Sequence, residues 1–197
     1  MVLPPENRTP RMEMLETIVA RTPREKLMDF PVLEPADHRL IGAFIQEFNY
    51  MDFNLRRAIE TFAYARLLSK GAAKKYPNIH SSEVATTVQD AVKAMDPAVE
   101  DIADTTKILW IIERRREIRN LLGHWAARRI PGEDAIVLLS KDENDAKRTG
   151  GRTLASGNVK QAVLDLADLR RVFEQIVPIE LWLAKKVFDW HARYVGD

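Results

Sequence analysis

A helical pattern over residues 108–129 constrains the fold of this chain more than any other stretch. Its apolar residues recur at the three- and four-residue spacing of a core-facing helix side: Ile108, Ile111, Ile118, Leu122 and Trp125. A line of polar residues follows one neighbouring helix face: Glu113, Glu117, Asn120 and His124. The pattern therefore predicts a long helix whose polar side is either half solvated or lines a polar site.

Similar apolar stripes predict that most of the chain is helical. We expect four helices, over residues 35–70, 82–95, 97–129 and from 158 to near residue 190. Pro35 suits a first helical position, and Asn158 with Gln161 resembles a capping box that opens the last helix. Pro178 should kink that helix or split it in two.

Strand signals occur in one region only. Residues 136–139 and 152–155 have the apolar and β-branched composition of short strands, and a polar loop with a Gly pair separates them. We expect a β-hairpin over about residues 134–156. The predicted fold class is all-α, an antiparallel bundle of four to five helices with this hairpin inserted after the helix of residues 97–129.

The first 34 residues differ from the rest in their proline content. Five prolines limit any helix there to short pieces, near residues 12–20 and 24–30. We expect residues 1–34 to form an arm that packs either on the body of the protein or on a second subunit. Residues 35–197 then form the helical body.

Composition excludes several classes of protein. The chain has no cysteine, so it has no disulfide, no thiolate nucleophile and no cysteine-ligated zinc. Its histidines lack the spacing of metal ligands, so we expect no metal and no cofactor. No apolar run is long enough to span a membrane, and the start lacks a signal-peptide pattern. We therefore expect a cytoplasmic protein without membrane contact.

The charge of the chain is uneven. The net charge is only +1, but residues 113–129 carry six arginines and two glutamates, a local excess of 6 − 2 = +4. Such a surface attracts anions, although an arginine-rich helix face is often merely solvated. We take Arg115, Arg116 and Arg128 as candidate substrate-binding residues.

The segment Arg119-Asn120-Leu121-Leu122-Gly123-His124 resembles the signature of the HEPN superfamily. It has an arginine followed by asparagine, a histidine after four intervening residues, and a place near the end of a helix in a helical chain. The resemblance extends more loosely over about residues 35–190 through the order of helices.

The resemblance implies a fold, an activity and an assembly. HEPN proteins are helical bundles, and many are metal-independent endoribonucleases of toxin–antitoxin or other defence systems. Their arginine and histidine meet in a cleft between the subunits of a homodimer. Carried over, Arg119 and His124 would be catalytic and Asn120 would shape the motif. RNA would be the substrate, and an antitoxin protein would be a candidate partner.

The side-chain chemistry agrees with that implication. Histidine titrates near working pH, so His124 could transfer a proton at a phosphodiester. Arg119 could hold a phosphate and stabilise its charge. Residues five apart lie about 140° apart around a helix, so Arg119 and His124 share a cleft only if it wraps the helix or a second chain completes it. The plainer interpretation is that His124 is a structural histidine near a helix C-terminus, where the helix dipole favours its cation.

Three carboxylates are candidate supporting residues: Glu47, Asp52 and Glu117. Glu117 could orient the site, although pairing with nearby arginines is the simpler interpretation. Two further functions stay open beside the ribonuclease. One is a non-catalytic HEPN-like module that binds RNA or regulates a partner. The other is a helical dimerisation domain in which the motif occurs by accident.

Overall fold

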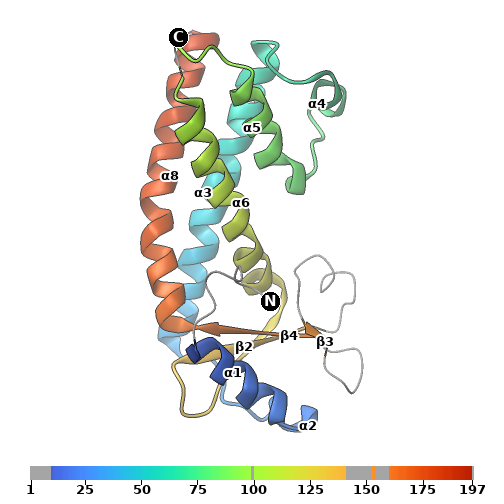
Figure 1. Cartoon of the computed structure of the whole chain (residues 1–197), viewed down its shortest axis with the longest axis vertical. Coiled ribbons are helices and arrows are strands. Elements are labelled where there is room, and N and C mark those ends of the chain that lie inside the picture. The colour runs from blue at the N-terminus through green and yellow to red at the C-terminus, as the bar shows by residue number, and fades with distance from the viewer. Residues whose placement is uncertain (1–9, 99, 141–151, 154–159, 197) are drawn as a thin grey trace. The chain divides into compact units, whose positions relative to one another are not determined.

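The computed structural model describes residues 10–98, 100–140, 152–153 and 160–196. The protein is mostly helical with one small antiparallel sheet, as the sequence predicts in outline (Figure 1). It divides into two compact units. Unit 1 contains residues 1–45 and 117–174, and unit 2 contains residues 46–116 and 175–197. No helix in the described part is both long and apolar enough to span a bilayer.

The helices follow the apolar stripes closely at their centres and less closely at their ends. The described helices are α1 (Pro10–Arg21), α2 (Arg24–Leu27), α3 (Pro35–Tyr64), α4 (Lys70–Lys75), the 3-10 turn η2 (Ser81–Glu83), α5 (Val84–Lys93), α6 (Ile102–His124) and α8 (Leu166–Tyr194). Helix α3 begins at Pro35 as predicted. Helix α8 continues through Pro178, so of the two outcomes predicted there, a kink or a split, the split is wrong.

The sheet is larger than the predicted hairpin. Its strands are β1 (Ala126–Arg129), β2 (Ala135–Ser140), β3 (Arg152–Thr153) and β4 (Lys160–Asp165). The order is β1-β2-β4-β3, and every pairing is antiparallel, with Val137 opposite both Arg128 and Val163. Strand β2 was predicted, but β3 pairs with β4 and not with β2. The confinement of strands to residues 134–156 is therefore wrong.

Two strands replace segments that were predicted to be helical. Residues 126–129 read Ala-Ala-Arg-Arg, which are strong helix formers, yet they pair along β2. Residues 160–165 were assigned to the last helix, yet they pair along the other side of β2. Strand β2 is buried over residues 135–139, and such a strand needs partners at both edges. Tertiary pairing thus overrides local propensity.

The N-terminal arm packs on the body of unit 1. Helix α1 contacts β4, and it buries Met12, Leu15 and Val19. Arg11 forms an ion pair with Asp165 at the end of β4 and a second with Glu133, at 3.2 Å. Of the two placements left open by the sequence, the structure shows the first.

Ion pairs around Arg129 hold the sheet to the start of α3 within unit 1. Asp37 is 1% exposed and accepts two hydrogen bonds from Arg129 Nη1, at 3.0 and 2.9 Å. Asp134 lies 3.3 Å from Arg129 Nη2 and accepts a 2.7 Å hydrogen bond from Arg170. The Arg170 hydrogen bond holds the pKa of Asp134 below its ordinary value, against the effect of burial.

Unit 2 is built from parts of α3, α6 and α8 together with α4 and α5. Phe62 of α3 packs on Trp190 of α8 with ring centroids 5.0 Å apart. The buried Glu100 accepts hydrogen bonds from Trp190, Thr105 and Lys186 at 3.0, 2.6 and 2.7 Å. Burial alone would raise the pKa of Glu100, but these donors lower it below the ordinary value. The carboxylate therefore joins the segment before α6 to α8.

Candidate functional site

The Arg-Asn-x3-His segment forms the last six residues of α6. Its apolar neighbours Ile118, Leu121 and Leu122 are buried, and they fix this end of the helix in unit 1. Arg119 is half-buried and donates a 3.3 Å hydrogen bond from Nη1 to the side-chain oxygen of Asn120. The shaping role of Asn120 that the resemblance implies stays a prediction, and this hydrogen bond is the contact that it would use.

His124 is the final residue of α6, and it is exposed. The helix stops there because Trp125 is buried and the chain continues directly into β1. An exposed imidazole beside a helix end can exchange protons with solvent or with a bound group. The position thus suits proton transfer, and it equally suits the plainer role of a C-terminal histidine.

Arg116, a predicted substrate-binding residue, lies among carboxylates. It is 7% exposed, and its Nη1 lies 2.6 Å from Asp52 Oδ1 while its Nε lies 3.0 Å from Glu113 Oε2. Both partners belong to unit 2, as Arg116 does. These contacts tie α3 to α6 within unit 2. Substrate binding by Arg116 and the supporting role of Asp52 stay predictions.

The other predicted residues are divided between the units. All four are half-buried. Unit 1, which holds the motif, contains Glu117 and Arg128, and unit 2 contains Arg115 and Glu47. Glu47 lies near Glu180 of α8: burial and then the charge of Glu47 raise the pKa of Glu180. Asn54 donates a 3.2 Å hydrogen bond to Glu180. The supporting role of Glu47 at the motif stays a prediction.

A pocket in unit 2 was not predicted from the sequence. It has a volume of about 260 Å³, and it is lined by Arg57, Glu60, Thr61, Tyr64, His191 and Val195. Arg57, Thr61 and Tyr64 recur at four and three residues along α3, a signal visible in the sequence. His191 and Val195 lie more than 120 positions later, so only the pairing of α3 with α8 reveals the pocket.

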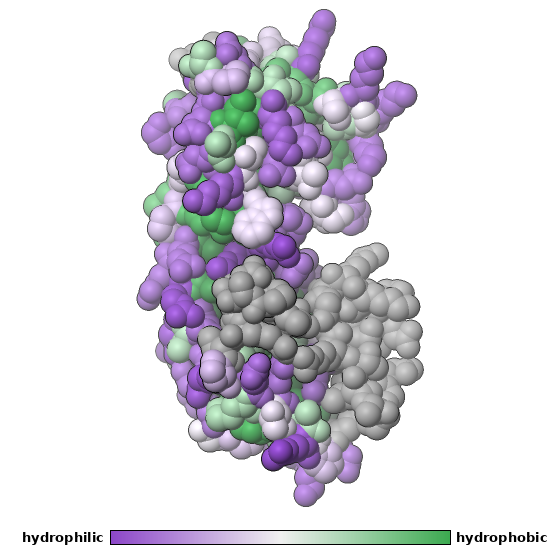
Figure 2. Space-filling model, viewed as in Figure 1, coloured by the Kyte–Doolittle hydropathy of each residue, from purple (hydrophilic) through white to green (hydrophobic). Residues whose placement is uncertain are grey.

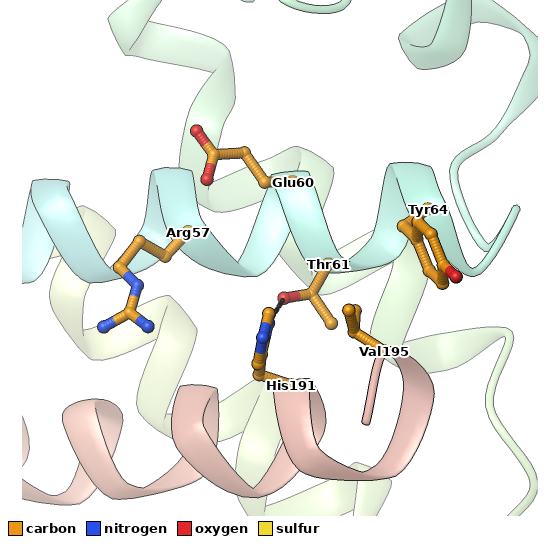
Figure 3. Close-up of a pocket in the computed structure, with 6 residues that line it drawn as sticks. All are labelled: Arg57, Glu60, Thr61, Tyr64, His191 and Val195. Atoms are coloured by element: carbon orange, nitrogen blue, oxygen red, sulfur yellow. Dashed lines mark hydrogen bonds between the residues drawn. The ribbon is translucent and has the colours of Figure 1, made fainter. Parts of the chain in front are cut away.

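The residues of this pocket differ in direction (Figure 3). Arg57, Thr61 and Tyr64 project from α3 toward α8, whereas Glu60 projects away from it. His191 faces Thr61, and its Nδ1 lies 3.4 Å from the Thr61 hydroxyl. The pocket therefore presents a guanidinium, an imidazole and hydroxyl groups, a combination that suits oxygen-rich ligands.

The described residues contain no group of three or more histidine and acidic side chains placed to hold a metal ion. No protein-family model, curated protein or solved structure matches this chain. Within the described residues, the candidate sites are the motif at the end of α6 and the pocket between α3 and α8.

Proposed function

We propose that this protein is a metal-independent endoribonuclease of HEPN type, with Arg119 and His124 as its catalytic pair. The hydrogen bond from Arg119 to Asn120, at the end of a helix that finishes in an exposed His124, is the observation that supports it most. The resemblance of residues 119–124 to the HEPN signature supplies the substrate class, RNA. A toxin–antitoxin or other defence system is the setting that it implies, with an antitoxin as partner.

The proposed reaction needs a base, an acid and a stabiliser of negative charge. The RNA 2′-hydroxyl attacks the adjacent phosphorus and loses its proton, and the P–O5′ bond breaks as the leaving oxygen gains one. His124 serves in proton transfer, and Arg119 stabilises the charge on the phosphoryl oxygens. The products are a 2′,3′-cyclic phosphate and a 5′-hydroxyl end, and no metal takes part.

A homodimer is part of the proposal. Arg119 and His124 lie about 140° apart around α6, so one helix does not present both to the same phosphate. Two motif helices that meet near a two-fold axis would bring Arg119 of each chain toward His124 of the other. A stable interface of this kind buries on the order of 1,200 Å² or more in total. A monomer at micromolar concentration, measured by light scattering, would refute the dimer.

The test is cleavage of a mixed RNA pool by the wild type, His124→Ala and Arg119→Ala. We expect each change to reduce the cleavage rate by roughly 10²–10⁴-fold, with EDTA having no effect and thermal melting unchanged. The control is the double variant His38→Ala/Arg39→Ala, which removes an exposed histidine and an exposed arginine at the start of α3. It should cleave like the wild type.

Two results would refute the enzyme. Equal cleavage by wild type and His124→Ala would show that the motif histidine takes no part. Absence of cleavage by wild type, with RNA binding that weakens as salt increases, would favour the non-catalytic RNA-binding module instead.

A further inference from the structure

A stretch without acidic residues follows the end of α3 in unit 2. Residues 61–82 contain no aspartate or glutamate, and they carry Arg66, Lys70, Lys74 and Lys75. Helix α4 presents the three lysines, and Figure 2 shows hydrophilic side chains projecting at the upper right, where Figure 1 places α4. The end of α3 and the segment after it therefore form a concentrated positive surface.

Some cations of this surface form ion pairs within the protein, and others do not. Lys75 lies 2.7 and 2.9 Å from the two carboxylate oxygens of Glu83, so its charge is neutralised. Arg66, Lys70 and Lys74 are exposed and have no hydrogen bond or ion pair from their side chains to any described residue. Three cations are thus left to meet anions from solution.

Arg66 adopts a backbone conformation that arginine rarely takes. Its φ is +58°, in the left-handed region that glycine prefers at the end of a helix. Backbone hydrogen bonds from Arg66 and Leu67 to the last turn of α3 fix this conformation. Strained positions of this kind cluster at functional sites, and this conformation is therefore consistent with a functional role for the Arg66 side chain.

Tyr64 lines the pocket between α3 and α8 and lies two residues before Arg66 in the sequence, so the pocket and this surface meet at the end of α3. Arg57 is exposed and directed toward α8. If the Thr61 hydroxyl donates to Nδ1 of His191, then Nε2 of the neutral ring carries the proton and can donate to a ligand oxygen. Arg57 and His191 together suit a phosphate group.

Negative features nearby do not cancel this charge. Two helices end at the pocket, and each C-terminus carries about half a negative charge. Glu60 adds one negative charge but projects away (Figure 3). Against these stand four full positive charges, on Arg57, Arg66, Lys70 and Lys74. The balance is about +2, so the surface favours a polyanion.

We propose that this surface binds single-stranded nucleic acid, with one phosphate in the pocket beside Arg57 and His191 and further phosphates along Arg66, Lys70 and Lys74. Tyr64 is 68% exposed, and an exposed aromatic ring can stack on a base that is not paired in a duplex. The surface thus joins a cationic track to a stacking ring. It consists of residues other than Arg119 and His124, so it holds whether or not the chain cleaves RNA.

The experiment is binding of fluorescein-labelled 12-nucleotide strands to the full chain, followed by anisotropy. One probe is 2′-O-methyl RNA, which has no free 2′-hydroxyl and so is not cleaved through one, and the other is DNA of the same sequence. Each phosphate contact contributes about −0.7 to the slope of log K against log salt for single strands. We expect Lys70→Gln/Lys74→Gln to make that slope shallower by about 1.4 and to weaken binding at least tenfold at low salt.

The matched control is Lys26→Gln/Lys107→Gln, which removes two exposed lysines from other parts of the chain. It should change the affinity less than twofold. Tyr64→Ala should weaken binding about tenfold while Tyr64→Phe keeps it, because stacking needs only the ring. Arg66→Gly should weaken binding without lowering the melting temperature, since glycine suits the positive φ.

Four results would overturn the proposal: no binding by the wild type, equal weakening by the two lysine pairs, equal affinity for duplex and single strands, or a preference for phosphatidylserine vesicles over both probes. A stronger affinity for 2′-O-methyl RNA than for DNA would identify the ligand as RNA, and the reverse would identify it as DNA. Failure of cleavage in the mixed RNA pool leaves these measurements unaffected.

Discussion

Two basic stretches of this protein differ in how their cations are partnered. On α6, Arg116 is buried between Asp52 and Glu113, at 2.6 and 3.0 Å. After α3, Lys70 and Lys74 are exposed and have no ion pair within the described residues. Both stretches are rich in basic residues, but one of the two acids that pair with Arg116, Asp52, lies 64 positions away in the sequence. Local charge therefore indicates a binding surface only when no distant carboxylate folds against it.

The largest effect is expected at Asp37, whose carboxylate is almost fully buried and forms an ion pair with Arg129. Its carboxylate also accepts a 2.8 Å hydrogen bond from the backbone N–H of Glu34. Asp37→Asn removes the nearest and most buried of the three carboxylates around Arg129 and leaves Asp134 and Glu34 at 3.3 and 3.4 Å. We therefore expect the free energy of unfolding in urea to fall by roughly 3 kcal/mol, the lower end of the range for a broken buried pair. Asp29→Asn, at an exposed aspartate of the same unit, should change it by less than about 0.5 kcal/mol.

A smaller loss is expected on α6. Arg116→Met keeps the length of the side chain but leaves Asp52, which is 27% exposed, without its cation. We expect a loss of roughly 2–3 kcal/mol, below the full value for a buried pair because Asp52 reaches solvent. Arg114→Met is the control, since Arg114 is exposed and lies over the Trp110 ring at 5.1 Å. If both changes cost the same, the ion pair to Asp52 has no special role.

The smallest change in stability is expected at Glu180, a carboxylate that lies near a second carboxylate, Glu47. Burial and the nearby Glu47 raise the pKa of Glu180, so the folded state favours its protonated form. That contribution to stability is present below the ordinary glutamate pKa of about 4.3 and is lost as pH rises through the folded value. Glu180→Gln keeps an acceptor for Asn54 and should stabilise the protein at pH 7 by up to about 1 kcal/mol.

The pH dependence is the check on this explanation. Thermal melting of Glu180→Gln and wild type should differ at pH 7 and converge near pH 4. The exposed Glu174 lies on the same helix, and Glu174→Gln should show no such pH-dependent gain. Glu100 behaves in the opposite way, because its hydrogen bonds lower its pKa and its contribution is lost as the pH falls.

The sequence predicts the helices better than the sheet, for physical reasons. Helices α3, α6 and α8 are long, and their apolar stripes are set by residues close in the chain. Strand β1 reads Ala-Ala-Arg-Arg, and only the neighbouring β2 makes it a strand. A single sequence does not show which distant elements pair with each other.

The candidate sites follow the same rule. The Arg119–His124 segment is local, so it is visible in the sequence, and the structure places it at the end of α6 as expected. The partnership of Arg116 with Asp52 joins α6 to α3, and the pocket of Arg57 and His191 joins α3 to α8. The spacing of Arg57, Thr61 and Tyr64 is local, but predicting their partner on α8, or the partner of Arg116 on α3, requires knowing which helices pack together.

The central claim is that Arg119 of one chain acts with His124 of another, and subunit mixing tests it most directly. Arg119→Ala and His124→Ala proteins should each be nearly inactive on RNA. After denaturation and joint refolding, mixed dimers contain one intact pair, contributed by both chains. We predict that RNA cleavage returns in the mixture and not in either variant refolded alone. A mixture that forms dimers and stays as inactive as its components would contradict the shared site.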